Sequence, residues 1–496
     1  KEPDKGSNKD APHSKVTIKL THECLFANEL GDGTLYATLF RDRFLFCKNS
    51  QEWYSWTGHF WERDVLGNCL VAVEEVVECY LGEYRRIAAQ IADIAKGTAS
   101  GDVEKLKKQQ AQLLKRASQL RGDKRRTACL KFAHTNNNSL AIKGNEFDIK
   151  PWLLACQNGV IALRTGELSA GRPSDYISMA SPVEWKGLDE PANLWKKTLL
   201  EIFHGDEELV FYLQRLFGYG ITGLSTEKAF FVLWGKGKNG KSLIVETISY
   251  VLGPLVGSIQ SEMLLSQYRS RSSAGPTPDI MSLKGLRMAF ASETDEGSKL
   301  SSSRVKWLTG NDEIVGRNPH DKYETRWQPV HKLFLLTNSL PHANASDFAL
   351  YERLQLLPFT LSFVNRSPQT MDERWAIKDL DEQLKKEAPG ILAWLVRGCL
   401  LWQEQGLDPP RKVIEAIEQY RRNEDLLADF IDECCEIEPG SQTKASELYS
   451  RFSEWYLENV GKKIPSNTWF GKSMSLKFEK NKINGCIHYH GVAVFV

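Results

Sequence analysis

AFFVLWGKGKNGKSLIVETISYVL, residues 229–252, is the segment that says most about the architecture. Its first six residues are all apolar, which is typical of a strand buried on both faces of a parallel sheet. The next eight match GxxxxGK[ST], and the residues after them favour a helix. Strand, glycine-rich loop and helix in this order predict a phosphate-binding loop, in which backbone N–H groups and the helix amino terminus hold phosphate oxygens.

We expect this loop to bind a nucleoside triphosphate, with ATP and Mg²⁺ as the ligands. Lys241 is predicted to reach the β and γ phosphates, and the Ser242 hydroxyl to hold Mg²⁺. The full set of expected nucleotide-binding residues is Gly235, Lys236, Gly237, Lys238, Asn239, Gly240, Lys241 and Ser242.

Hydrolysis needs an acidic residue after a second strand, and residues 287–292 are predicted to form that strand. Glu293 follows directly and is the first candidate to hold Mg²⁺ or to polarise the attacking water. Asp295 and Glu296 lie close behind, so one of them can share this catalytic role. The alternative is that residues 293–296 form an ordinary acidic loop.

Two further candidates follow a third predicted strand, residues 332–337. Asn338 ends that strand, where its amide can orient the attacking water. Arg353 precedes another apolar strand at residues 355–359. It can form a structural ion pair, or it can act as an arginine finger on the γ-phosphate held by a neighbouring subunit, an effect worth about 10³ to 10⁵ in rate.

Between the second and third strands, residues 312–328 favour a polar hairpin with a turn at residues 318–322. Such a hairpin would project from the ATPase core. Arg317, His320 and Lys322 are its candidate DNA-binding residues, although a hydrophilic turn without any ligand is also common.

The N-terminal third is expected to mix short strands and helices. Residues 35–40 and 43–46 are interpreted as strands, and WYSWTGHFW at residues 53–61 as a hairpin with packed tryptophans. These rings favour a small core, with a nucleic-acid stacking platform as the alternative. Residues 83–131 are expected to be helical with a break at residues 97–101, and they hold 13 Lys or Arg against five Asp or Glu. This segment is either a solvated helical hairpin, an accessory nucleic-acid surface or a subunit collar.

Composition excludes several classes of protein. The 496 residues carry a net charge of +1, so any nucleic-acid contact depends on local basic patches. The ten cysteines include no CxxC pair, which favours reduced thiols. We find no apolar run near 18 residues and expect no membrane contact. Because the first 14 residues are polar, they are interpreted as a linker after a missing upstream domain.

The fold class predicted is α/β: a P-loop AAA+-type ATPase core with a mixed α+β N-terminal region, helical segments and a C-terminal winged-helix-like module. The expected divisions are a linker (1–15), an N-terminal α+β domain with the basic helical segment (16–190), the ATPase core (191–362), a helical segment (363–440) and the winged-helix-like domain (441–496).

The motifs together resemble those of superfamily-three helicases, within them the phage and plasmid primase-helicase family with the poxvirus-type primase C-terminal region. The strings that carry this resemblance are NGVIALRTGEL (158–168), ASETDEG (291–297), LTGNDEIVGR (308–317), LFLLTNSLP (333–341), APGILAWLVRGCLLW (388–402) and GLDPP (406–410).

The resemblance implies a homo-hexameric ring on single-stranded and forked DNA that hydrolyses ATP between subunits and moves 3′ to 5′ in the cytoplasm of a bacterial host cell. It assigns the roles given above to Lys241, Ser242, Glu293, Asn338 and Arg353. Glu352 departs from the family, whose members often have a basic or aromatic residue there. Asp379-Leu380-Asp381 is interpreted as surface, so primase activity is expected only of an upstream domain.

Two other functions fit the sequence. One is an ATP-regulated DNA-binding initiator or assembly scaffold that relies on the C-terminal module and the basic segment. The other is a P-loop ATPase that acts on protein partners.

Overall fold

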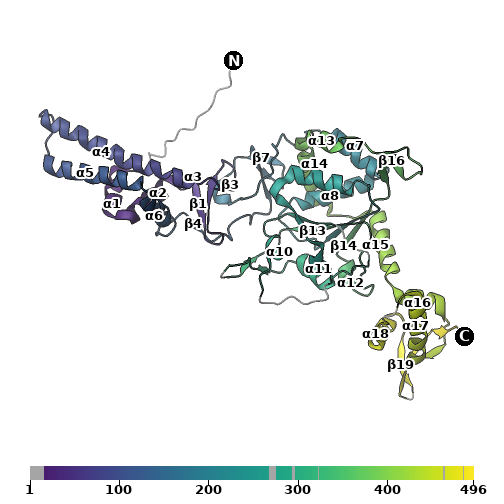
Figure 1. Ribbon diagram of the computed structural model, residues 1–496. Helices are drawn as coiled ribbons and strands as arrows, with labels where there is room; N and C mark the ends of the chain where they lie inside the picture. Colours follow the sequence, from purple (N-terminus) through teal and green to yellow (C-terminus); the bar gives the residue numbers. More distant parts are fainter. Residues whose placement is uncertain are drawn as a thin grey trace.

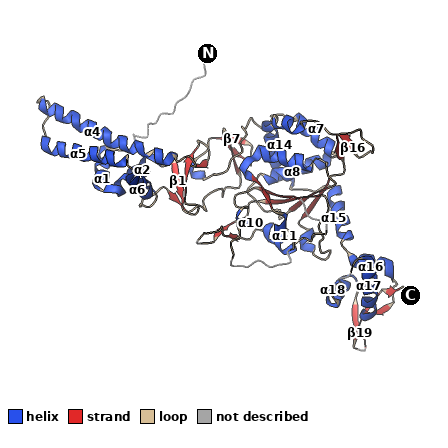
Figure 2. Cartoon of the chain, in the orientation of Figure 1, coloured by secondary structure: helices blue, strands red, loops and turns tan. Residues whose placement is uncertain are grey.

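The computed structural model describes residues 16–266, 275–292, 297–321, 323–461, 464–483 and 485–495. Figure 1 shows a helical N-terminal part, a central part built on a sheet, and a small C-terminal part at the far end of the chain. Figure 2 shows that helices cover both faces of the central sheet. Among these residues, no helix is both long and apolar enough to cross a membrane.

The N-terminal part packs its helices around one core and adds a small sheet in the order β3-β2-β1-β4. Its elements are α1 (Ile18–Phe26), α2 (Asn28–Phe40), β1 (Phe44–Cys47), β2 (Glu52–Trp56), β3 (Trp61–Arg63), α3 (Asn68–Val71), α4 (Val73–Ala95), α5 (Val103–Leu120), α6 (Asp123–Ala133) and β4 (Ala141–Ile142). The expected break in the helical segment is confirmed, because α4 ends at Ala95 and α5 begins at Val103.

The strand expected at residues 35–40 is wrong, because these residues form the second half of α2. Leu35, Tyr36 and Phe40 are fully buried, and α2 packs against α1, α4 and α6. A short apolar run fits a buried strand or a buried helix equally well, and here the surrounding helices decide between them.

The tryptophan-rich hairpin is confirmed: Trp56 pairs with Trp61 across β2 and β3, with ring centroids 5.2 Å apart. Trp61 is only 2% exposed, and its indole N–H donates to the Pro173 carbonyl at 2.9 Å. Burial of this ring favours the core interpretation over a stacking platform for nucleic acid.

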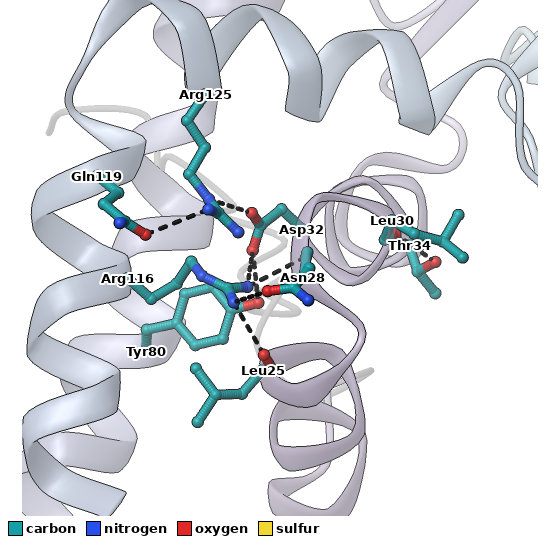
Figure 3. Close-up of polar contacts among 9 residues, drawn as sticks. All are labelled: Leu25, Asn28, Leu30, Asp32, Thr34, Tyr80, Arg116, Gln119 and Arg125. Atoms are coloured by element: carbon teal, nitrogen blue, oxygen red, sulfur yellow. Dashed lines mark hydrogen bonds and ion pairs between the residues drawn. The ribbon is translucent and has the colours of Figure 1, made fainter.

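A buried ionic cluster joins four of the N-terminal helices, α2, α4, α5 and α6 (Figure 3). Asp32 of α2 is fully buried and accepts hydrogen bonds from Arg116 and Arg125, each at 2.8 Å, and from the Tyr80 hydroxyl at 2.9 Å. Because breaking a buried ion pair costs about 3–5 kcal/mol, this cluster fixes α2 against α5 and α6.

A three-stranded antiparallel sheet links the N-terminal part to the centre. Its strands are β5 (Leu153–Cys156), β6 (Gly159–Ala162) and β7 (Glu167–Ser169). Leu154 and Ile161 belong to the same hydrophobic core as the central sheet.

Five parallel strands form the central sheet in the order β14-β8-β13-β10-β9. They are β8 (Phe230–Trp234), β9 (Val256–Ile259), β10 (Met288–Ser292), β13 (Lys332–Thr337) and β14 (Leu354–Pro358). The three strands expected around the phosphate loop are thereby confirmed. Alternate residues face opposite sides: Phe231 and Leu233 join one core, and Phe230 and Val232 join the other.

Each face of the sheet has its own helices. One is covered by α7 (Asn193–Ile202), α8 (Glu207–Gly220), α9 (Lys241–Leu252) and α14 (Ala388–Gln405), and the other by α10 (Pro278–Met281), α11 (Ser302–Leu308) and α12 (Phe348–Tyr351). The remaining central elements are β11 (Ile314–Gly316), β12 (Thr325–Trp327), β15 (Ser362–Val364), β16 (Glu373–Trp375) and α13 (Leu380–Lys385).

The C-terminal part follows α15 (Arg411–Asn423) and has its own core, which includes Phe430, Phe452 and Phe470. Its elements are α16 (Leu426–Cys434), β17 (Cys435–Glu436), β18 (Gln442–Lys444), α17 (Ala445–Asn459), α18 (Asn467–Lys477), β19 (Lys480–Ile483), β20 (Cys486–His490) and β21 (Ala493–Val494). From Ala445 onward, two helices are followed by three strands.

Candidate functional site

The predicted phosphate loop connects the carboxyl end of β8 to the amino end of α9. Gly240 has a φ of +89°, and a Cβ there would lie 2.6 Å from the Ile202 side chain. A Cβ on Gly235 would lie 2.1 Å from the Phe359 carbonyl oxygen. Both positions therefore require glycine, and the loop lies close against α7 and the end of β14.

Lys241 is the buried cation of this loop. It is 6% exposed, and its ammonium donates to the Gly235 carbonyl at 2.5 Å and to the Asn338 side-chain oxygen at 3.2 Å. Burial lowers the pKa of Lys241 from its usual 10.5 to about 8. Among the described residues its partners are two neutral oxygens, and a buried ammonium so placed favours an anion as a further neighbour.

Two main-chain contacts hold the loop in place. The Phe363 N–H donates to the Lys238 carbonyl at 2.6 Å, and the Asn239 side-chain amide donates to the Phe359 carbonyl at 3.4 Å. Asn239 is 3% exposed, so its side chain supports the loop and only its backbone can face phosphate.

A cavity of about 410 Å³ opens beside the loop. Its volume lies in the range of small-molecule sites. The lining residues are Gly237, Lys238, Asn239, Gly240, Lys241, Ser242, Leu243 and Asn338, together with Thr198, Glu201 and Ile202 of α7 and Phe363, Ala376, Ile377, Asp379, Leu380 and Asp381. Six of the eight predicted loop residues therefore line one cavity, with the exposed Ser242 side chain beside Lys241.

Sequence reasoning missed the second wall of this cavity. Residues 363–381 lie more than 120 positions after Lys241, and no motif marks them. The exposed Asp379 and Asp381 were expected to be ordinary surface, yet both line the cavity. Apolar Phe363 and Ile377 with carboxylates nearby can surround a base and its sugar.

The predicted acidic residues Glu293 and Asp295, with Glu296, lie outside the described residues. The strand before them is described: Ser292 ends β10 and is the partner of Leu336 in β13. Asn338 follows β13 by one residue and contacts Lys241. The carboxyl ends of β8, β10 and β13 therefore meet at one edge of the sheet.

Arg353 lies at the opposite edge. Its carbonyl accepts a hydrogen bond from the N–H of Phe230, the first residue of β8, while the phosphate loop follows the last residue of that strand. Four steps along a strand span about 13 Å, so Arg353 does not reach the phosphate loop of its own chain. Its guanidinium donates to the Ala349 carbonyl at 2.6 Å, and its Nε is buried without a partner among the described residues.

The expected hairpin is confirmed as β11 and β12, which pair antiparallel beside α10. Arg317 begins the turn. Its carbonyl accepts a hydrogen bond from the Thr277 N–H at 2.8 Å, and its own N–H donates to the Thr277 hydroxyl at 3.1 Å. His320 is exposed at the turn, and Lys322 lies outside the described residues. Sequence reasoning missed Tyr323, whose side chain is 82% exposed beside His320.

Comparison with known proteins gives one family match and several relatives. The family described as "D5 N terminal like" matches residues 33–204. "Putative helicase L207/L206" of Acanthamoeba polyphaga mimivirus is 28% identical over 332 residues, which cover 64% of this chain and 34% of the relative. "Putative primase C962R" of African swine fever virus (isolate Warthog/Namibia/Wart80/1980) is 25% identical over 340 residues, again 64% and 34%.

This chain spans about a third of the length of these curated relatives. Among solved structures, the A form apo structure of the NrS-1 C-terminal region is similar with a TM-score of 0.43 and 14% identity, covering 72% of this chain and 87% of the other. The chain is thus similar to proteins that are named as viral helicases and primases, and it has a mixed α/β fold with a parallel sheet.

Proposed function

We propose that this chain is an ATP-dependent DNA helicase of the superfamily-three type and the C-terminal part of a primase-helicase. The observation that carries this proposal is the buried Lys241, held by Gly235 and Asn338 and facing a cavity lined by the phosphate loop. The relatives are named as putative helicases and primases, and these names support a role in DNA replication.

In this proposal the sheet is an AAA+-type core and the carboxyl edge is one half of the active site. Lys241 neutralises the phosphates of ATP, and the loop N–H groups cradle them. Ser242 and Glu293 would hold Mg²⁺, which supplies charge neutralisation when bound. Asn338 orients the attacking water, with Glu293 or Asp295 polarising it.

The other half of the site is proposed to come from a neighbouring subunit. Arg353 is too far from the loop of its own chain, and its buried Nε lacks a partner among the described residues. Both observations favour a role in trans, in which Arg353 stabilises the charge that develops on the γ-phosphate. A homo-hexameric ring provides such neighbours.

The β11–β12 hairpin is the proposed contact with single-stranded DNA. Arg317, His320 and Lys322 would meet phosphates, and the exposed Tyr323 ring can stack on a base. Contacts of this kind are largely independent of base sequence and weaken as salt rises.

Unwinding of a tailed duplex by wild type, Lys241→Ala and Lys196→Ala tests the proposal. Lys196 is an exposed lysine of α7 without an ion pair among the described residues, so it controls for the loss of one positive charge. We expect wild type and Lys196→Ala to separate the strands with ATP and Lys241→Ala to leave them paired. Equal unwinding by all three would contradict the proposal.

A second candidate function is an ATP-regulated DNA-binding initiator. It is favoured by the C-terminal part, where Lys472 on α18 and Lys480 and Lys482 on β19 are all exposed. A helix and a hairpin with lysines fit a winged-helix-like contact with duplex DNA. Tight binding of one duplex sequence over others by the full chain, together with a failure to unwind any tailed duplex, would favour this second function.

A further inference from the structure

In the basic segment, residues 83–131, the arginines and the lysines differ in whether they have partners within the fold. All six of its arginines have partners within the fold. The pairs are Arg85 with Glu78, Arg86 with Glu83, Arg116 and Arg125 with Asp32, Arg121 with Glu74, and Arg126 with the carbonyls of Leu70 and Val71. Figure 3 shows two of them, Arg116 and Arg125, directed at the buried Asp32. The arginines of this segment therefore stabilise the helices.

The lysines of the same segment behave differently. Lys107 lies 3.9 Å from Glu104, and the other six form no ion pair within the described ranges. These six are Lys96, Lys105, Lys108, Lys115, Lys124 and Lys131, and all of them are exposed. Their charges contribute nothing visible to the fold.

Three of these lysines share one face of α5. At about 100° per residue, Lys105, Lys108 and Lys115 fall within an arc of about 80°. Gln112 and Gln119 lie in the same arc, and the acidic residue beside it is Glu104, about 20° outside the arc and four residues before Lys108. The buried residues Leu113, Ala117 and Leu120 are centred about 130° around the helix from the three lysines, whose side chains are exposed.

This arrangement has a cost for the free protein. Lys105 and Lys108 are like charges three residues apart on one helix, and such pairs destabilise an isolated helix. A negatively charged partner would remove the repulsion. In Figure 1, α4 and α5 extend away from the central sheet as a long hairpin, and the side chains of Lys105, Lys108 and Lys115 are all exposed.

The chemistry of the face indicates which polyanion fits. The 18 residues of α5 include no aromatic side chain, whereas proteins that hold single strands commonly stack bases on aromatic rings. Lysine contacts phosphate as a point charge and has no fork that reads a base edge. The span from Lys105 to Lys115 is about 15 Å, a straight and rigid row that suits the regular backbone of a duplex.

We propose that the lysine face of α5, formed by Lys105, Lys108 and Lys115, binds the phosphate backbone of duplex DNA without regard to base sequence. The face lies outside the nucleotide site, and this role goes beyond the helicase function. It would hold a duplex whether or not the protein unwinds it.

The test is equilibrium binding of a fluorescent 20-base-pair duplex by the full chain without nucleotide, measured by anisotropy from 50 to 300 mM salt. The variant is Lys105→Gln/Lys108→Gln/Lys115→Gln. The matched control removes three exposed lysines of the central part: Lys186→Gln/Lys196→Gln/Lys386→Gln. Each variant lowers the net charge by the same amount.

We expect the α5 variant to bind about tenfold more weakly at 100 mM salt. The slope of its logarithmic salt dependence should be shallower by about two to three, close to 0.9 for each phosphate that the variant no longer neutralises. The control should match wild type. ATP turnover without DNA should match wild type in both variants, so failure of the helicase proposal leaves this test intact.

Three results would overturn the inference. One is an equal weakening of binding in both variants, which would mean a general charge effect. Another is weaker binding of a 20-nucleotide single strand with duplex binding unchanged. The third is an altered assembly state, measured by light scattering, with an unchanged salt dependence, which would identify the face as a contact between subunits.

Discussion

Two buried lysines at opposite edges of the central sheet differ in what satisfies their charge. At the carboxyl edge, Lys241 is 6% exposed and donates to one carbonyl and one side-chain amide. At the amino edge, Lys332 is 3% exposed and donates to the carbonyls of Thr222, Leu224 and Val330. Its ammonium also lies 5.2 Å from the centre of the Tyr219 ring.

The difference distinguishes Lys332, whose charge stabilises the fold, from Lys241, which is proposed to bind phosphate. All three protons of the Lys332 ammonium have carbonyl acceptors, and burial lowers its pKa well below the usual 10.5. Arg287 beside it is similar, since its guanidinium donates to the carbonyls of Ile221 and Leu153. Within the described ranges Lys241 has fewer acceptors, and it faces a cavity. Burial alone therefore does not distinguish the two lysines, and the proposed phosphate-binding role of Lys241 rests on the cavity and on its unfilled hydrogen-bonding capacity.

Substitution of Arg353 is expected to have the largest effect on ATP turnover. Arg353 lies at the amino edge of the sheet, as Lys332 does, yet its Nε is buried without a partner among the described residues. If it acts on a neighbour's nucleotide, Arg353→Ala should lower ATP turnover about 10³-fold or more. Mixing it with Lys241→Ala subunits should restore part of the activity, since some interfaces then combine an intact loop with an intact arginine. Turnover that stays at the level of the separate variants at every ratio would assign Arg353 a structural role.

Lys241→Ala should lower ATP turnover about 10²- to 10³-fold, as removal of one preorganised charge does at other catalytic sites. Thermal unfolding should hardly change, because the two hydrogen bonds that Lys241 makes to described residues end on neutral oxygens. A large loss of stability would place Lys241 in the same structural class as Lys332.

Lys332→Met should produce the reverse result. It leaves three carbonyls without this donor, which costs about 1–3 kcal/mol for each group left unsatisfied, so we expect a loss of at least about 3 kcal/mol in the free energy of unfolding. ATP turnover per folded molecule, measured below the unfolding transition, should stay close to wild type. Loss of ATP turnover in a fully folded Lys332→Met protein would contradict the assignment of a purely structural role to Lys332.

The smallest effect concerns pH. The pKa of Lys241 is about 8, so most of the free protein carries a neutral Lys241 above that pH. Anionic phosphate favours the charged form, and binding must then take up a proton. Affinity for ATP should therefore be level below pH 8 and fall above it, by up to about tenfold per pH unit.

Calorimetric titration from pH 7 to pH 10 measures this pH dependence. Lys241→Arg is the control, because arginine stays charged throughout this range. An equal fall in affinity in both proteins would attribute the effect to another group.

Much of the central sheet could be predicted from sequence. The apolar runs of β8, β10 and β13 are buried on both faces, so their composition alone distinguishes them, and the phosphate loop has a fixed spacing. The hairpin of β11 and β12 was also predictable, because its turn residues mark it. Residues 35–40 were not, since their burial depends on helices far along the chain.

The distribution of charge partners was the least predictable part. Lys241, Lys332 and Arg287 cannot be ranked from sequence, because the acceptors of the latter two are backbone carbonyls that the fold supplies. The second wall of the cavity was missed for a related reason: Phe363 and Ile377 reach the phosphate loop only through the packing of distant segments.

Electron microscopy of the full chain with single-stranded DNA, Mg²⁺ and a non-hydrolysable ATP analogue tests the central claim most directly. The account predicts a ring in which the γ-phosphate lies within hydrogen-bond distance of Lys241 from one subunit and Arg353 from the next, with the β11–β12 hairpin against the DNA. A nucleotide bound away from Lys241, or an Arg353 that remains on the Ala349 carbonyl far from any phosphate, would contradict it.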